Sequence, residues 1–291
     1  MGAEGRSRMA IVIVTRNRCG TLLHTLDQLS APEQNHRVLV VDNASSDGTE
    51  SAVRARAPET TVISLSRNLG SAARTCGVLE ASEPYIAFCD DDSWWGPGAL
   101  SRAEQLLDLN PGLGLIAGRV LVGQEEREDP TCRLMRDSPL PGLPGLPGTP
   151  VLGFLACATV VRRSAYLEAG GFHPLFGVGG EESLLALDLA AAGWDLAYVP
   201  EIVAHHHPPA RSDHTGRRRQ QARNALWFAW MRRPLSGALH ETASVLRRGL
   251  SDRAVARGIS DAVAGSGLVL RERRPVGPEL ERRLRQLDHS M

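Results

Sequence analysis

Four short apolar runs alternate with helical patterns in the first ninety residues, and this alternation constrains the fold more than any other feature. Each run has the length of one buried strand, and the four are Met9–Thr15, Val38–Val41, Val62–Leu65 and Tyr85–Cys89. Continuous runs rich in β-branched residues are typical of parallel strands that are buried on both faces. The alternation of strands and helices therefore predicts an α/β fold with a parallel sheet and right-handed crossovers.

Three consecutive carboxylates, Asp90, Asp91 and Asp92, follow the fourth predicted strand directly. Neighbouring like charges repel each other by ~1 kcal/mol per pair at 4 Å in water, and by more in a drier site. Such a cluster is therefore either fully solvated, as in an acidic surface turn, or built around a cation. Ligands of parallel sheets bind beyond the carboxyl ends of the strands, which is where these residues are expected.

Two common nucleotide-binding motifs are absent from the chain. No G-x-G-x-x-G turn follows the first predicted strand, and the glycine-rich segment 177–180 lies far downstream. A P-loop requires a lysine, and all 33 basic residues of this chain are arginines. We therefore set aside a dinucleotide-binding Rossmann domain and a P-loop nucleotidase.

The rest of the chain continues the α/β pattern and ends in helices. Further strands are predicted at 113–122, 154–161, 194–199 and 202–204. We expect Ser93–Gly98 to be a turn, 124–150 to be one long loop and 268–277 to be a linker. Helical spacing predicts terminal helices over 220–231, 240–249 and 279–287.

Formal charge is zero overall but is unevenly distributed. Residues 1–204 carry 16 arginines and 25 acidic residues, whereas residues 205–291 carry 17 arginines and 8 acidic residues. The basic end either pairs with the acidic body or meets an anionic partner. Five scattered cysteines without a C-x-x-C pair, and no apolar run near the ~20 residues of a membrane span, predict a cytoplasmic protein. Peripheral attachment to a membrane surface is left open.

Several motifs occur in order along the chain: Val12–Asn17, Val40–Thr49, Arg67–Gly70, Asp90–Asp92, Gly170–Glu182 and Gly193–Trp194. Together they resemble glycosyltransferase family 2, whose members are inverting enzymes of GT-A fold that use nucleotide-diphospho-sugars. The resemblance covers Met9 to His207. It implies a GT-A domain over 9–207, in which a Rossmann-like nucleotide-binding half-sheet is joined to an acceptor-binding half. A disordered N-terminus (1–8) and a basic, mainly helical C-terminal extension (208–291) would flank this domain.

By this resemblance, Asp90 contacts the donor ribose and Asp92 binds the metal, with Asp91 between them. Carboxylate oxygens suit Mn²⁺ or Mg²⁺, and an ion between them and the diphosphate would stabilise the departing group. Four further residues are expected beside the donor nucleotide, namely Thr15, Arg16, Asp42 and Arg67.

The resemblance also assigns a catalytic base. Family members carry a Glu-Asp pair after a glycine, with the Asp as base, whereas this chain has Glu181 and Glu182. Glu182 takes the base position, with Glu181 as its neighbour, and its extra methylene moves the carboxylate oxygens by about 1.5 Å. Asp188 is a second difference, because relatives often carry an arginine there. The alternative for the glutamate pair is an acidic helix N-terminus that the helix dipole stabilises.

Histidines and tryptophans flank the expected metal site. Relatives often have a metal-binding histidine after the last strand, and here His205 is the expected ligand, with His207 as second choice. Trp94 and Trp95 either stack on an acceptor or pack in the core.

An aromatic group near the C-terminus consists of Trp227, Phe228 and Trp230, with several arginines around it. Packing of this aromatic face on the catalytic domain is favoured over binding to an anionic membrane or to a phosphate-bearing acceptor.

These features predict a metal-dependent inverting glycosyltransferase that moves a hexosyl or related group to an acceptor hydroxyl or amine, with Glu182 as base. The acceptor is left open among small molecules, glycans and lipid-linked compounds, and no nucleic-acid partner is expected. One alternative is a non-catalytic nucleotide-sugar-binding relative. A sugar nucleotidyltransferase is less favoured, because no glycine-rich segment of the kind that binds a triphosphate follows the first strand.

Overall fold

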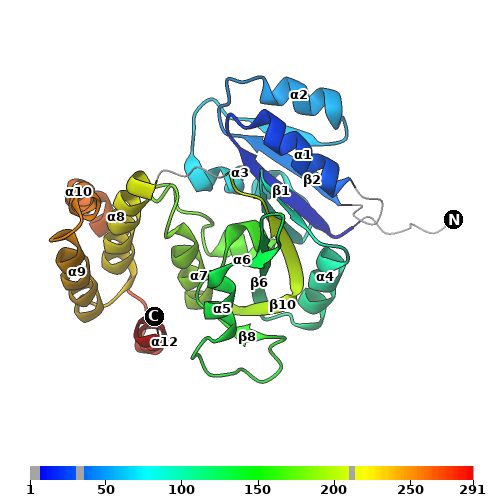
Figure 1. Ribbon diagram of the computed structural model, residues 1–291. Helices are drawn as coiled ribbons and strands as arrows, with labels where there is room; N and C mark the ends of the chain where they lie inside the picture. The colour runs from blue at the N-terminus through cyan, green and yellow to red at the C-terminus, as the bar shows by residue number, and fades with distance from the viewer. Residues whose placement is uncertain (1–6, 31–35, 210–213, 291) are drawn as a thin grey trace.

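A computed structural model describes residues 7–30, 36–209 and 214–290. Its centre is one mixed sheet with helices packed around it, and a group of C-terminal helices stands beside this body (Figure 1). The sheet has the strand order β3-β2-β1-β4-β9-β6-β10-β5. Residues 1–6 of the expected disordered N-terminus lie outside the described part. Arg8 is described and pairs with Asp108 at 2.7 Å.

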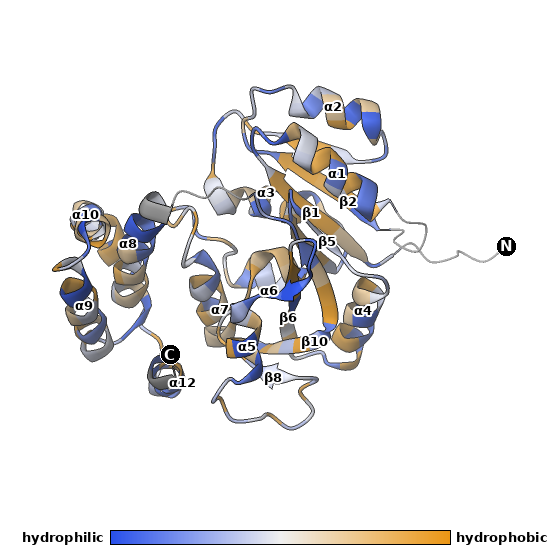
Figure 2. Ribbon diagram, in the orientation of Figure 1, coloured by the Kyte–Doolittle hydropathy of each residue, from blue (hydrophilic) through white to orange (hydrophobic). Residues whose placement is uncertain are grey.

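The first half of the sheet is parallel, as the sequence predicts. It consists of β1 (Met9–Thr15), β2 (Arg37–Asp42), β3 (Thr61–Ser64) and β4 (Tyr85–Asp90). Residues 9–13 of β1 are fully buried, which explains why this strand is apolar throughout (Figure 2).

Three helices connect these strands: α1 (Cys19–Leu29), α2 (Thr49–Arg56) and α3 (Ala73–Glu80). A single turn of 3-10 helix at Gly70–Ala72 leads into α3. Gly77 of α3 lies so close to β1 that a Cβ atom there would be 2.5 Å from Cγ1 of Val12. A glycine at this position therefore allows the helix to approach the sheet closely.

The second half of the sheet differs in part from the prediction. It contains β5 (Ser93–Trp95), β6 (Leu113–Val122), β9 (Thr159–Arg162) and β10 (Asp195–His206). The two strands expected at 194–199 and 202–204 form the single strand β10, because a register shift between Val199 and Val203 absorbs the interruption. The expected turn at Ser93–Gly98 begins with β5, which pairs antiparallel with β10. The strand expected from residue 154 starts only at Thr159, after a 3-10 turn.

The segment 124–150 was expected to be a loop, but it contains regular structure. Two short strands, β7 (Arg127–Glu128) and β8 (Thr149–Pro150), extend the sheet, and helix α5 (Pro130–Arg136) lies between them. The Asp129 side chain caps α5 by accepting a hydrogen bond from the Thr131 amide at 2.8 Å. An aspartate followed by proline is a helix-start signal, so this helix was predictable from local sequence.

We call the sheet and the helices packed around it, up to residue 209, the body. Its remaining helices are α4 (Ala99–Leu109), α6 (Arg163–Glu168) and α7 (Glu181–Ala191). The C-terminal group consists of α8 (His214–Arg232), α9 (Leu235–Gly249), α10 (Arg253–Ala264), α11 (Ser266–Arg271) and α12 (Pro278–Ser290). The sequence predicted helices near α8, α9 and α12, but it did not predict α10. Helix α11 occupies the first residues of the segment that was expected to be a linker.

The C-terminal helices have a hydrophobic core of their own that also includes residues of the body. Phe176 and Leu184 come from the body, and Leu226, Trp227 and Met231 come from α8. The aromatic group was expected to pack on the catalytic domain, and Trp227 does contact Phe176 there. Hydrogen bonds from Trp227 to Ala262 and from Trp230 to Thr242 show that the group also packs among the C-terminal helices. No helix in residues 7–30, 36–209 and 214–290 combines the length and the hydrophobicity needed to cross a membrane.

Candidate active site

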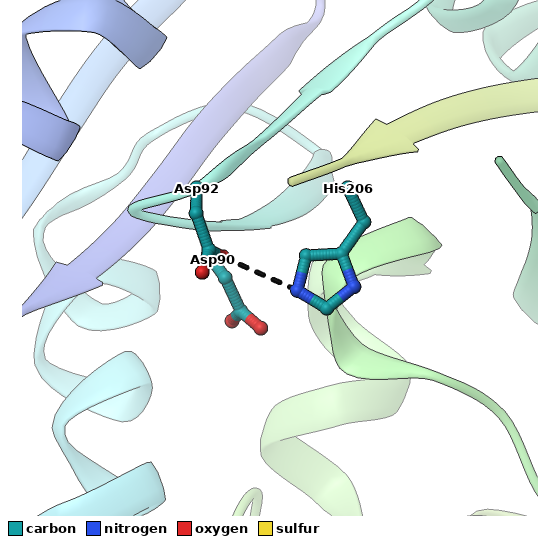
Figure 3. A group of neighbouring side chains, drawn as sticks. All are labelled: Asp90, Asp92 and His206. Atoms are coloured by element: carbon teal, nitrogen blue, oxygen red, sulfur yellow. Dashed lines mark ion pairs between the residues drawn. The ribbon is translucent and has the colours of Figure 1, made fainter. Parts of the chain in front are cut away.

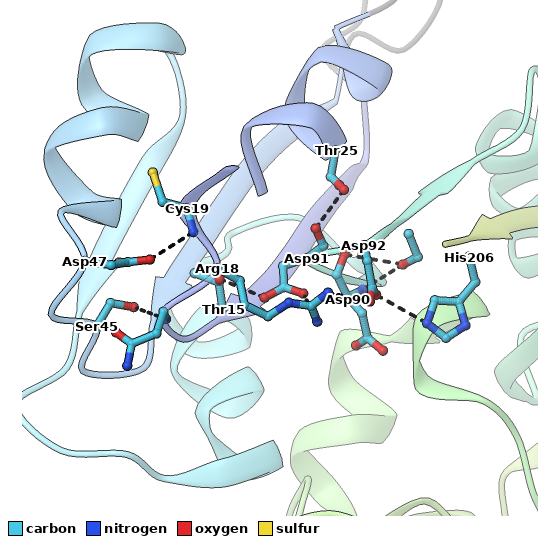
Figure 4. Close-up of polar contacts among 12 residues, drawn as sticks. Thr15, Arg18, Cys19, Thr25, Ser45, Asp47, Asp90, Asp91, Asp92 and His206 are labelled. Carbon is cyan, nitrogen blue, oxygen red and sulfur yellow. Dashed lines mark hydrogen bonds and ion pairs between the residues drawn. The ribbon is translucent and has the colours of Figure 1, made fainter. Parts of the chain in front are cut away.

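The carboxyl ends of the first strands meet at one edge of the sheet. Thr15 pairs in register with Asp42 of β2, and Val14 pairs with Asp90 of β4. Because these strands are parallel, their last residues and the loops that follow them lie together. The structure thus brings Thr15 and Asp42 to the same edge as the three aspartates. Figure 4 shows Thr15 beside these aspartates.

Asp91 is held by partners from the β1 end of the site. Its carboxylate accepts a hydrogen bond from the Thr15 hydroxyl at 2.8 Å and pairs with the Arg18 guanidinium at 2.7 Å. Its backbone carbonyl accepts a hydrogen bond from Thr25. Burial raises the pKa of Asp91 to about 6, although Arg18 and Thr15 favour the ionised form.

Asp92 has two partners that lie far apart in the sequence. The Arg18 guanidinium lies 2.8 Å from one carboxylate oxygen, and Nε2 of His206 lies 3.3 Å from the other. Burial opposes ionisation, but hydrogen bonds from His206 and Arg18 outweigh it and lower the pKa of Asp92. Burial likewise opposes protonation of His206, yet the neighbouring carboxylate raises the pKa of this imidazole.

Asp90 pairs with Arg74, a buried residue of α3. The Arg74 guanidinium also experiences the charges of Glu181 and Glu182, which raise the pKa of this residue although burial lowers it. Arg74 thus pairs with the aspartate cluster and lies within electrostatic range of the glutamate pair. Asp91 and Asp92 are 5% and 4% exposed, which excludes a solvated surface turn.

Two carboxylates and one imidazole form a group that could hold a metal ion (Figure 3). Asp90, Asp92 and His206 each offer one ligand atom, and these three atoms lie within 4.8 Å of one another. Two carboxylates and one imidazole are a donor set that suits a divalent metal ion.

The histidine in this group is His206, whereas the prediction named His205 as the ligand, with His207 as second choice; the structure brings neither of these two into the group. Successive residues of a strand point to opposite faces, and His206 and its two neighbours are therefore separated. Nδ1 of His205 lies 3.0 Å from the Glu126 carboxylate. Both neighbouring rings contact Trp94. The sequence could not distinguish these alternatives, because the register of β10 was unknown.

The glutamate pair opens α7. Glu182 accepts a hydrogen bond from the Ala156 amide at 2.9 Å. Burial, together with the adjacent charge of Glu181, raises the pKa of Glu182 to about 8. Burial also raises the pKa of Glu181, and its Oε2 is buried without a hydrogen-bond partner in the described part of the chain. A carboxylate with an elevated pKa that lines a cavity is well suited to accept a proton.

The loop before this pair is held by α8. Asn224, which is fully buried, donates hydrogen bonds from Nδ2 to the carbonyl oxygens of Phe176, at 3.0 Å, and of Gly179. Gly179 and Gly180 have φ values of 90° and 95°, a conformation that favours glycine. The position of Glu182 thus depends on a residue of the C-terminal helices.

The other expected site residues occupy different environments. Arg16 and Arg67 are exposed on their loops, outside the buried cluster. Trp95 is 1% exposed and packs in the main core, so its ring presents no face to an acceptor. Trp94 is half-buried and stays a candidate for acceptor contact.

Arg18, Arg74, His206 and Asn224 were not predicted as site residues. Arg18 follows β1 closely and could have been considered as a counter-ion for the aspartates. Arg74 stands among small residues in a predicted helix, which is a weak sign of a buried charge. Asn224 carried no local signal, because its contacts are made to residues 176–179.

A cavity of about 1070 Å³ adjoins Glu182. The body contributes Glu182 and Phe154 to the lining of this cavity. Helices α8, α9 and α12 contribute Phe228, Arg248 and Leu287. Most of its wall is apolar, with charged groups at intervals. A molecule with both polar and apolar parts would match this lining.

Residues 10–169 match the family model described as glycosyl transferase family 2. The chain is 28% identical over 248 residues to the N-acetylglucosaminyl-diphospho-decaprenol L-rhamnosyltransferase of Mycobacterium tuberculosis, covering 72% of this chain and 78% of the relative. It is 38% identical over 101 residues to the uncharacterized glycosyltransferase YwdF of Bacillus subtilis, covering 33% of this chain and 36% of that protein.

Solved structures share the fold. The mannosyltransferase PcManGT from Pyrobaculum calidifontis, in complex with GDP-Man and Mn²⁺, has a TM-score of 0.62 at 21% identity, covering 90% of this chain and 76% of that one. S. aureus TarS 1–349 in complex with UDP-GlcNAc has a TM-score of 0.57 at 16% identity, covering 76% of this chain and 67% of that one. The predicted GT-A fold is therefore confirmed.

Proposed function

The chain belongs to glycosyl transferase family 2, and on that premise we propose a metal-dependent, inverting transfer of a sugar from a nucleotide-diphospho-sugar to an acceptor. The enzyme class is that of its relatives, which are named glycosyltransferases. The observation that supports the finer proposal is the group of Asp90, Asp92 and His206, with Asp90 paired to Arg74 and the charges of Glu181 and Glu182 near enough to raise the pKa of that arginine. Donor and acceptor sites must adjoin in this way for direct displacement.

The donor is assigned to the carboxyl edge of the sheet. Asp90, Asp92 and His206 would hold Mn²⁺ or Mg²⁺, and such an ion would neutralise charge on the departing diphosphate. Thr15 and Asp42 lie at the ends of β1 and β2, where we place the nucleotide base and ribose. A diphosphate is a favourable partner for a guanidinium, so Arg18 would turn from the aspartates toward the donor.

Glu182 is assigned as the general base. Inversion by direct displacement needs one carboxylate within hydrogen-bond reach of the acceptor hydroxyl, on the face opposite the leaving group. Glu182 lines the large cavity, whereas Asp90, Asp92 and His206 do not line it. The carboxylate must be ionised to accept the proton, so its raised pKa favours activity at mildly alkaline pH.

The acceptor is assigned to the cavity beside Glu182. The mycobacterial relative is named for an acceptor that consists of a sugar, a diphosphate and a decaprenol. The cavity of this chain has apolar walls formed by residues such as Phe154, Phe228 and Leu287, together with arginines. We therefore place a lipid-linked sugar acceptor ahead of a small polar acceptor or a free glycan.

Two steps test this proposal. A thermal-shift screen of nucleotide sugars, with and without Mn²⁺, should find a donor that raises the unfolding temperature only with the metal, because a ligand of the folded state stabilises it. That donor is then incubated with the enzyme, and release of the nucleoside diphosphate is measured with and without acceptor. Metal-dependent binding without any donor turnover would favour the non-catalytic alternative, which the Glu182 and Asp188 differences first suggested.

A further inference from the structure

Helix α9 and the residue that caps its C-terminus, Leu250, carry an exposed row of leucines, which we call the leucine stripe. Its members are Leu235, Leu239, Leu246 and Leu250, and their exposed fractions are 61%, 58%, 49% and 90%. At 100° per residue these four side chains fall within an arc of about 60°, along roughly 22 Å of helix. Residues on another side of α9, namely Gly237, Ala238 and Val245, are buried against the rest of the protein.

The stripe is not an ordinary scatter of surface hydrophobic residues. Seven of the eleven large hydrophobic side chains that are exposed in the described structure lie between residues 235 and 270. Single exposed leucines are common on soluble proteins, but aligned ones mark an interaction surface. Helix α9 packs on α8 and α10 and lies on the outer side of the C-terminal group, away from the sheet (Figure 1).

The charge of this region indicates which partner would cover the stripe. Residues 214–290 carry 16 arginines and 7 acidic residues, a formal charge of +9. Arg247 is exposed on α9 beside the stripe, and Arg253 and Arg257 are exposed on α10. A second copy of the chain would bring a stripe in an equally basic surrounding, so self-association through this face is electrostatically unfavourable.

We propose that the leucine stripe docks the protein on an anionic membrane surface. A helix with leucines on one side and arginines beside them is the pattern of interfacial helices, which bury their apolar face at the boundary of headgroups and acyl chains. The arginines would contact lipid phosphates. This surface differs from the aromatic group of Trp227, Phe228 and Trp230, which packs within the C-terminal helices.

The same helix connects the stripe to the cavity. Glu241 and Arg248 of α9 line the cavity beside Glu182, while the leucines point outward from that helix. Docking through α9 would therefore bring the cavity close to the bilayer surface, where a lipid-linked acceptor resides. The docking itself does not depend on the proposed reaction and can be measured without any substrate.

Vesicle co-sedimentation of the full chain tests the proposal. Vesicles of phosphatidylcholine are compared with vesicles that also contain phosphatidylglycerol. We expect binding to the anionic vesicles that weakens at high salt, and a loss of about tenfold or more in the variant Leu239→Ser/Leu246→Ser. The matched control is Leu79→Ser/Leu109→Ser, which alters two exposed leucines of the body, 62% and 75% exposed, and should bind like the wild type.

Other results would overturn the proposal. Absence of vesicle binding, or equal binding by both double variants, would show that the stripe does not contact lipid. A wild-type dimer that becomes monomeric in Leu239→Ser/Leu246→Ser, measured by light scattering, would assign the stripe to a second copy instead. Because all four leucines are exposed, the variants should keep the wild-type unfolding temperature, which is measured in parallel. Arg247→Glu should weaken binding only to the anionic vesicles.

Discussion

The carboxylate of Asp188 in α7 accepts two hydrogen bonds from the guanidinium of Arg232 in α8, with Oδ1···Nε at 2.5 Å and Oδ2···Nη2 at 2.9 Å. The bidentate geometry fastens the C-terminal helices to the helix that begins with Glu181 and Glu182. It also accounts for the acidic residue at position 188, which the sequence left unexplained.

Replacing Asp188 by Ala should destabilise the fold. Arg232 is 7% exposed, and the loss of its partner would leave a buried charge without a carboxylate, at a cost of roughly 3–5 kcal/mol. Urea unfolding measures this change. The control is Glu201→Gln, which breaks an exposed pair with Arg102 and should change stability by about 1 kcal/mol or less. Equal effects of the two substitutions would show that the Asp188 pair has no special structural role.

Replacing Glu182 by Gln should reduce sugar transfer by about 10²–10⁴-fold, because the amide cannot accept the acceptor proton. Metal-dependent donor binding, measured by thermal shift, should stay as in the wild type, since Glu182 lies outside the metal-binding group. Glu201→Gln, which makes the same chemical change at an exposed position outside the cavity, serves as control. Transfer at the wild-type rate in Glu182→Gln would disprove the assignment of the base.

The metal-binding group can be tested with its two adjacent histidines. His206→Ala and Asp92→Asn should abolish the Mn²⁺-dependent part of donor binding, because each removes one of three candidate ligands. His205→Ala removes the neighbouring ring, which contacts Glu126 and Trp94. This variant should keep the Mn²⁺-dependent part of donor binding. Titration of Mn²⁺ at fixed donor concentration measures the difference. Loss of Mn²⁺-dependent donor binding in His205→Ala but not in His206→Ala would assign the metal ligand to His205, as the sequence first suggested.

The dependence of stability on pH should report the raised pKa of Glu182. A carboxyl group whose pKa is higher in the folded than in the unfolded protein holds its proton more tightly when folded, so its contribution weakens as pH rises. For Glu182 the loss should occur between the ordinary value of 4.5 and about 8. Unfolding free energies of the wild type and Glu182→Gln, measured from pH 5 to 9, should therefore diverge, with the variant relatively more stable at the alkaline end.

The same titration predicts the direction of the pH effect on catalysis. Transfer should increase as Glu182 ionises, since only the carboxylate accepts a proton.

In the stability measurement, Asp91, with a pKa raised to about 6, adds a smaller change in unfolding free energy at lower pH. This change is common to the wild type and Glu182→Gln. Parallel stability curves for wild type and variant would show that Glu182 is not perturbed as the structure indicates.

Local patterns predicted the donor half of the fold well. Apolar runs marked β1, β2, β3 and β4, because strands buried on both faces leave a continuous signal. The position of the aspartate cluster followed from its place after β4. Short or half-exposed elements were harder to recognise, and β5, with three residues, was taken for a turn.

Residues that depend on distant contacts could not be predicted in the same way. Arg74 and Asn224 acquire their roles only when α3 and α8 pack against the glutamate loop, and no local pattern records that packing. The choice among three consecutive histidines depends on the register between β10 and β5, which is a property of the assembled sheet.

The cavity beside Glu182 is built from two parts of the chain that contribute separately. Some of its lining residues belong to the body that carries the proposed nucleotide site, whereas α8, α9 and α12 complete the enclosure. Substitutions in these three helices can therefore reshape the enclosure while the strand ends at Thr15, Asp42 and Asp90 stay unchanged. Under the proposed assignment, a change of acceptor would need no change at the strand ends that bind the sugar donor.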